Sequence, residues 1–300
     1  MQTRTNTSIH STASGQVAYS TGFVTSKDGT RIGYRQLGHG PGVVVLHGAM
    51  ESAASHMELA EAMADRFTVY LPDRRGRGMS GAPGPHYRMQ TEVDDLDALL
   101  RATDTQSVFG VSAGALILLQ AALELPAIRK AGVFEPPLTS ANSALTAWMA
   151  RYDREMARGD VAAAMVTGML GAEMGPAAMR AMPRWLLESL TNMMMKSEDK
   201  KGAGDLLPMR TLAPTLHYDG ALILEMEGTL ERFRAIRAET LLLGGSKSPA
   251  YLRGAVAALE PVIPGARRVE FAGLDHGASG PSNRGGKPQL VAEELVRFFA

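Results

Sequence analysis

Short apolar runs alternate with longer segments of helical periodicity along most of this 300-residue chain. A short, mainly apolar run predicts a strand covered on both faces, because such a strand has no solvent side. Runs of this kind occupy residues 43–46, 68–71, 107–111, 132–134 and 239–243, and residues 268–271 are predicted as a further strand. Helical patterns separate them, over about residues 52–64, 93–102, 115–125, 251–259 and 288–299. This alternation predicts a mostly parallel sheet with helices on both faces.

The start of the chain has a different pattern. Residues 1–20 are polar and rich in Ser and Thr, and they predict a flexible N-terminal arm. Residues 22–25 and 31–35 flank Lys27-Asp28-Gly29, and an Asp-Gly pair between two such segments is typical of a β-hairpin. We therefore expect a hairpin to precede the parallel part of the sheet.

Residues 138–236 contain no convincing strand. Alanine, methionine and leucine recur there at helical spacing, interrupted by Gly and Pro. A helical block between two strands of a parallel sheet predicts a cap over the sheet. The expected organisation is thus a core of residues 21–137 and 237–300, with a helical cap over residues 138–236.

Most of the 18 methionines lie in this expected cap. Methionine adapts its shape, so it either fills the interior of a helical cap or lines an accommodating apolar pocket. The sequence leaves both interpretations open. The second predicts that Met193, Met194, His217 and Tyr218 contact a substrate with a bulky apolar part.

Composition narrows the range of functions. The 31 basic residues balance the 31 acidic ones, so no electrostatic footprint for nucleic acid is expected. The absence of cysteine excludes disulfides and cysteine-ligated metals. No run reaches the ~18 apolar residues that span a bilayer, and the polar N-terminus is unlike a signal peptide. We expect a cytoplasmic protein that binds a small-molecule substrate and no nucleic acid or membrane; nothing indicates its oligomeric state.

The segment Gly110-Val111-Ser112-Ala113-Gly114 fits the pattern G-x-S-x-G between a predicted strand and a predicted helix. A serine on a sharp strand-to-helix turn needs small neighbours two positions away on either side, so that strand and helix can approach each other. The turn then exposes the hydroxyl at the edge of the sheet. Ser112 is therefore the candidate nucleophile.

His47-Gly48-Ala49 follows the predicted strand 43–46, where open α/β sheets place their sites. Acyl transfer needs two N–H donors for the oxyanion, and we assign them to Ala49 and Ala113. His47 itself is interpreted as a buried histidine that bridges backbone groups. The glycine- and arginine-rich segment 72–81 lacks the G-K-[ST] ending of a phosphate loop and is interpreted as a structural turn.

His276, in Gly273-Leu274-Asp275-His276-Gly277, follows the last predicted strand. The order nucleophile, acid, histidine places the general base late in the chain, so His276 is the candidate base. Asp275 is adjacent in sequence to His276 and is poorly placed to hold its ring.

Together these segments resemble the α/β-hydrolase fold superfamily, in its serine-nucleophile branch with a helical cap. The resemblance implies an eight-stranded, mostly parallel sheet, a cap after the sixth strand, no cofactor or metal, and hydrolysis of an ester, amide or thioester. The haloalkane dehalogenase and epoxide hydrolase branches use an aspartate nucleophile, so Ser112 argues against their chemistries.

The acid departs from the usual family pattern, because Ser248 stands where an aspartate is expected after the seventh strand. In related hydrolases the acid also occurs at the end of the sixth strand, where this chain has Glu135. Glu135 follows Ser112 by one helix and one strand, the crossover that joins neighbouring parallel strands, and it precedes His276. We predict Glu135 as the acid, with Asp219 in the cap as a weaker candidate.

These residues predict a serine hydrolase that cleaves a carboxylic ester, lactone or thioester through an acyl-enzyme. The same serine and histidine also suit a cofactor-free lyase, a haloperoxidase-like enzyme or a cyclising tailoring enzyme. Because the usual acid is missing, a non-catalytic ligand-binding protein is a further alternative.

Overall fold

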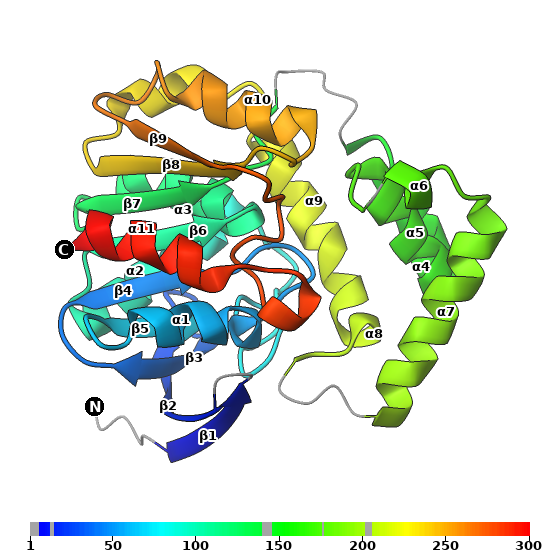
Figure 1. Ribbon diagram of the computed structural model, residues 1–300, viewed down its shortest axis with the longest axis horizontal. Coiled ribbons are helices and arrows are strands. Elements are labelled where there is room, and N and C mark those ends of the chain that lie inside the picture. Colours follow the sequence, from blue (N-terminus) through cyan, green and yellow to red (C-terminus); the bar gives the residue numbers. More distant parts are fainter. Residues whose placement is uncertain (1–5, 13–14, 140–145, 176, 202–205) are drawn as a thin grey trace.

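The computed structural model describes residues 6–12, 15–139, 146–175, 177–201 and 206–300. One nine-stranded sheet runs through the molecule in the order β1-β2-β3-β5-β4-β6-β7-β8-β9 (Figure 1). Its strands are β1 (Asn6–Thr12), β2 (Gly15–Thr25), β3 (Arg31–Gly38), β4 (Gly42–Leu46), β5 (Thr68–Pro72), β6 (Ser107–Val111), β7 (Lys130–Phe134), β8 (Glu239–Gly245) and β9 (Arg267–Phe271). In the order of the sheet, neighbouring strands from β5 through β4, β6, β7 and β8 to β9 pair in parallel. The neighbours β1–β2, β2–β3 and β3–β5 pair antiparallel.

Strands β2 to β9 form the mostly parallel, eight-stranded sheet that the family resemblance implies. The β2–β3 hairpin turns at Asp28-Gly29 as expected, with Thr25 opposite Arg31. Within residues 1–20, for which the sequence predicted a flexible arm, the structure has a ninth strand, β1, and Asn6–Thr12 pairs with β2. Polarity suggested the arm, but Thr, Ile and Val favour extended backbone.

Successive residues of the central strands point to opposite faces of the sheet, as strand geometry requires. Val44 and Leu46 join one buried cluster with α2 (Met89–Thr103), α3 (Ala113–Glu124) and α10 (Ala250–Leu259). Val43 and Val45 join another with η1 (Ala53–His56), α1 (Met57–Met63) and α11 (Pro288–Phe299). In Figure 1, α1 and α11 lie in front of the sheet. The helices therefore cover both faces.

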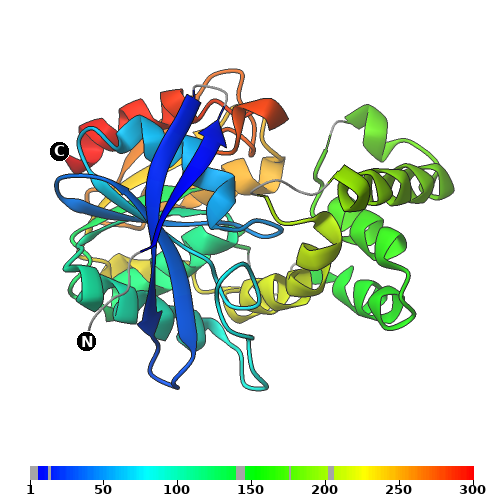
Figure 2. The same cartoon turned by 90° about the horizontal axis from the view of Figure 1, so that it is seen from below.

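In the described part of residues 138–236, the segment predicted as a cap, every regular element is a helix or a 3₁₀ turn. These elements are α4 (Met149–Ala157), α5 (Val161–Gly171), α6 (Ala177–Arg180), α7 (Arg184–Lys201), α8 (Met209–Leu212), η3 (Ala213–Thr215), α9 (Leu216–Glu225) and η4 (Leu230–Ala235). Helix α9 packs against both α3 and α4, while α4 to α7 extend away from the sheet (Figures 1 and 2). The described helices include none with the length and apolar character needed to traverse a bilayer.

Candidate active site

The candidate nucleophile Ser112 lies between β6 and α3 with φ 54° and ψ −118°. Positive φ is strained for a residue with a side chain, and surrounding contacts must hold it in place. The Ser112 N–H donates to the carbonyl of Phe134 over 2.9 Å. A Cβ on Gly110 would lie 2.5 Å from the Gly114 carbonyl oxygen, and one on Gly114 would lie 2.4 Å from that of Leu46. Both glycines of G-x-S-x-G are thus required by close backbone approach.

The candidate acid and base are in direct contact. His276 Nδ1 lies 2.6 Å from Glu135 Oε2, and the Glu135 side chain is fully buried. The second carboxylate oxygen of Glu135 accepts the Gly245 N–H over 2.6 Å. A carboxylate only accepts hydrogen bonds, so Nδ1 carries the proton of this contact, and Nε2 is the ring nitrogen on the side away from Glu135. This is the orientation that a general base requires.

The register of the sheet brings these groups to one edge. Val111 pairs with Phe134, and Phe134 pairs with Leu243, so the residues that follow all three strands start at the same level. Phe134 lies between the groups: its carbonyl binds Ser112, and its ring centroid is 6.3 Å from that of His276. Within the described residues Ser112 makes no hydrogen bond to His276. Such contacts are often loose in unliganded enzymes.

The loop after β4 passes directly over the nucleophile. A Cβ on Gly48 would lie 3.0 Å from Ser112 Cβ, so a side chain there would force its neighbours to shift by a few tenths of an ångström. The Gly48 N–H is already used, because it donates to Glu51 Oε2 over 2.7 Å. The Ala49 N–H has no acceptor among the described residues. Ala113 is the first residue of α3, where N–H groups have no partner within the helix. Both predicted oxyanion donors are therefore available.

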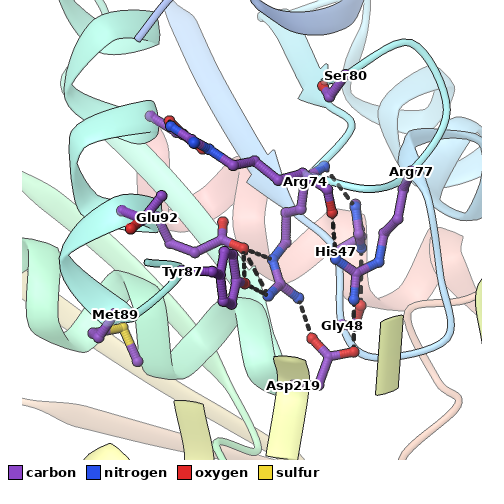
Figure 3. Close-up of polar contacts among 12 residues, drawn as sticks. His47, Gly48, Arg74, Arg77, Ser80, Tyr87, Met89, Glu92 and Asp219 are labelled. Atoms are coloured by element: carbon purple, nitrogen blue, oxygen red, sulfur yellow. Dashed lines mark hydrogen bonds and ion pairs between the residues drawn. The ribbon is translucent and has the colours of Figure 1, made fainter. Parts of the chain in front are cut away.

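His47 is buried and bridges two backbone groups, as the sequence suggested. Its Nδ1 lies 2.9 Å from the Gly48 carbonyl, and its Nε2 accepts the Arg74 N–H over 3.1 Å (Figure 3). Burial, followed by the charges of Arg77 and Arg74, holds the pKa of His47 well below 6.5. The ring is therefore neutral and joins the loop after β4 to the loop after β5. We call residues 47–51 the oxyanion loop, because they include the candidate oxyanion donor Ala49.

Sequence reasoning missed a second carboxylate–histidine pair beside the site. Glu51 Oε2 lies 3.1 Å from His56 Nε2, and His56 Nδ1 lies 3.2 Å from the Ser279 carbonyl. Burial alone would raise the pKa of Glu51, but His56, Gly48 and His276 together lower it. Burial alone would lower the pKa of His56, but Glu51 raises it. An acidic residue two positions after Ala49 was the only sequence signal.

The segment after β5 is a structural turn, as expected, and its arginines bind protein carboxylates. Asp73 organises it by accepting the N–H groups of Ala53 (2.8 Å) and Met79 (3.0 Å). Arg74 and Arg77 both bind Asp219, one to each carboxylate oxygen. Asp219 as a second candidate for the acid is therefore wrong: both its oxygens are occupied, and Glu135 holds His276.

Ser248, at the position where the family usually has its acid, is buried. Its hydroxyl has no hydrogen-bond partner among the described residues, while its carbonyl accepts from Arg253 Nε over 3.0 Å. It takes no part in the Glu135–His276 contact.

The predicted substrate-binding residues of the cap are spread over two helices. Met193 and Met194 lie on α7, which packs against α5 and α8, and their side chains are 61% and 50% exposed. Met193 lines a surface hollow with other residues of α7, among them Ser189 and Asn192. His217 and Tyr218 lie on α9, nearer the core: His217 Nδ1 contacts Asp153 Oδ1 at 2.8 Å, and the ring of Tyr218 packs on that of Tyr87. Substrate contact by these four residues stays a prediction.

Known proteins are similar to this chain in sequence and in fold. The sequence pattern of the family described as "Alpha/beta hydrolase family" matches residues 43–293. An alpha/beta hydrolase from Sphaerobacter thermophilus is 32% identical with a TM-score of 0.75, over 93% of this chain and 100% of that one. An esterase from a Rhodococcus species has the fold at 22% identity and a TM-score of 0.63, over 92% and 97%. An uncharacterised protein of Mycobacterium bovis is 29% identical over 100 residues, or 33% of this chain and 29% of its relative.

Proposed function

Since the chain belongs to the alpha/beta hydrolase family, we propose that it is a serine hydrolase acting on a carboxylic ester, lactone or thioester. The observation that carries this proposal is the 2.6 Å contact between Glu135 and His276 at the edge of the sheet where the Ser112 elbow lies. The esterase neighbour is too distant in sequence to support more than the fold. The substrate class therefore rests on the chemistry of the site.

The proposed reaction gives each of these groups one role. His276 Nε2 accepts the hydroxyl proton as Ser112 attacks the carbonyl carbon, and Glu135 stabilises the imidazolium that forms. The N–H groups of Ala49 and Ala113 stabilise the oxyanion of the tetrahedral intermediate. The imidazolium then protonates the leaving alcohol or thiol. Water, deprotonated by His276, then attacks the acyl carbon; the bond to Ser112 Oγ breaks, the imidazolium returns its proton to that oxygen, and the acid leaves. The methionine-rich cap supports a substrate with a bulky apolar part.

A fluorophosphonate probe tests this proposal, because it phosphonylates only an activated serine. We expect labelling of the wild-type protein and of Ser248→Ala, and none of Ser112→Ala. Hydrolysis of a panel of p-nitrophenyl esters, lactones and thioesters should be lost in the same variant. An unlabelled wild-type protein, or equal labelling of Ser112→Ala, contradicts acyl transfer at Ser112. Labelling without turnover of any substrate in the panel contradicts the proposed substrate class.

A further inference from the structure

A buried ion-pair network joins the cap to the core directly behind the oxyanion loop (Figure 3). Arg74 lies at its centre with a side chain only 1% exposed. Its Nη1 donates to Asp219 Oδ1 on α9 over 2.9 Å, and its Nη2 donates to Glu92 Oε1 on α2 over 2.9 Å. Tyr87 completes this cluster with a hydroxyl hydrogen bond to Glu92. Arg74 therefore connects a cap helix to a core helix.

Asp219 is bound twice from the same loop. Besides its contact with Arg74, it accepts from Arg77 Nη2 over 2.6 Å through its other oxygen. The side chains of Asp219 and both arginines are at most 1% exposed. In such a site the loss of one partner leaves a buried charge unpaired, so the three groups hold a single arrangement.

The same loop also holds the oxyanion loop. The backbone N–H of Arg74 donates to His47 Nε2 over 3.1 Å, and His47 Nδ1 donates to the Gly48 carbonyl over 2.9 Å. Gly48 in turn lies against Ser112 and precedes Ala49. A continuous series of contacts thus runs from α9 through Asp219, Arg74 and His47 to the loop that carries the candidate oxyanion donor.

We propose that Asp219 is a positioning residue, which transmits the docking of cap helix α9 to the oxyanion loop through Arg74 and His47. Asp219 holds the loop after β5 in the position in which the Arg74 N–H donates to His47. His47 in turn fixes the Gly48 carbonyl. The donor role of Ala49 rests on the proposed function. The mechanical link from α9 to residues 47–49 does not.

Helix α9 offers a matched control, because it contacts the core at a second point. Glu225, near its C-terminal end, accepts the Met89 N–H at the start of α2 over 3.0 and 3.2 Å. Glu225 contacts neither the loop after β5 nor His47. Glu225→Gln therefore weakens the attachment of the same helix without touching the series of contacts to the oxyanion loop.

The experiment compares Asp219→Asn with Glu225→Gln in the full chain by steady-state kinetics on a small p-nitrophenyl ester. We expect Asp219→Asn to lower kcat by about 10²-fold, the effect of misplacing one oxyanion donor, with little change in KM. Glu225→Gln should leave kcat within about twofold of wild type. Hydrogen exchange of residues 47–51 gives a second readout: it should accelerate in Asp219→Asn and stay as in wild type in Glu225→Gln.

Equal losses of kcat in the two variants would show that Asp219 serves only to attach the cap, which overturns the proposal. Unchanged exchange of residues 47–51 in Asp219→Asn overturns it as well. If the wild-type protein turns over no ester, the proposed function fails, and the exchange result alone decides the mechanical link. Should Asp219→Asn not fold, Asp219→Glu keeps the charge but displaces the carboxylate by one methylene, and the same two readouts decide.

Discussion

At the scale of single residues, the candidate site depends on the two hydrogen bonds that one buried carboxylate accepts, one through each oxygen. Glu135 gives one oxygen to His276 and the other to the Gly245 N–H. A glutamine of the same shape can keep an acceptor for Gly245, but it loses the negative charge that holds the histidine proton on Nδ1. Replacement of Glu135 by glutamine therefore removes the charge beside His276 and leaves a side chain of nearly the same size at residue 135.

We predict that Glu135→Gln lowers turnover by up to about 10⁴-fold, the scale of loss when a triad acid becomes an amide. The ester assay of the purified variant measures this, with circular dichroism to verify the fold. The control is Ser248→Ala: its hydroxyl is buried without a partner, so its removal should change turnover by less than about twofold. Near-normal turnover of Glu135→Gln would mean that His276 works without an acid or with another one.

At the scale of elements, the site depends on how closely α3 crosses β4. Gly114 allows this crossing, because a Cβ there would lie 2.4 Å from the Leu46 carbonyl oxygen and 2.7 Å from that of His47. Both are backbone atoms of the segment that leads into the oxyanion loop. A side chain at residue 114 must therefore push the helix away from the strand.

We predict that Gly114→Ala lowers the free energy of unfolding by about 1–3 kcal/mol, the usual effect of overpacking, and also lowers turnover. Gly254→Ala in α10 is the matched control, since a Cβ there meets nothing within 4 Å. Alanine in place of an unobstructed helical glycine should instead stabilise by about 0.5–1 kcal/mol. Urea denaturation of both variants measures the difference. A stable, fully active Gly114→Ala would contradict the close crossing.

At the scale of the whole molecule, segments far apart in the chain meet through Glu51 and His56. Glu51 belongs to the oxyanion loop, His56 to η1, and the Ser279 carbonyl to the segment before α11. The folded protein lowers the pKa of Glu51 below 4.5 and raises that of His56 above 6.5. Above pH 4.5 the Glu51 contribution to stability is present, and below pH 6.5 the His56 contribution is present. The pair therefore stabilises the fold most between these values.

We predict that the Tm difference between wild type and Glu51→Gln is largest near pH 5.5 and shrinks by about pH 9, as His56 loses its proton in both states. Thermal melts of the two proteins over this range measure it. Asp153→Asn is the control: its partner His217 is about half exposed, and exposed ion pairs contribute little. A Tm difference that does not change with pH would mean that the pair is not charged in the folded protein.

The sequence by itself determined the features that depend on local pattern and on chain order. Apolar runs predicted the central strands β4, β6, β7 and β8, because a strand buried on both faces must be apolar along most of its length. The spacing of Gly110, Ser112 and Gly114 predicted the elbow, because its backbone approach tolerates only glycine. The order of Ser112, Glu135 and His276 predicted the contact between acid and base, since neighbouring parallel strands end at the same edge.

Tertiary structure alone decided which distant polar groups meet. Asp219 was a reasonable second candidate for the acid until its two oxygens were seen to bind Arg74 and Arg77. The Glu51–His56 pair escaped prediction for the same reason. The pairing of β1 with β2 was also visible only in the structure. Hydrophobic periodicity records only whether a position is buried. The partner of a buried charge is set by how helices and loops pack in three dimensions, and one charge pattern along a chain is compatible with many such pairings.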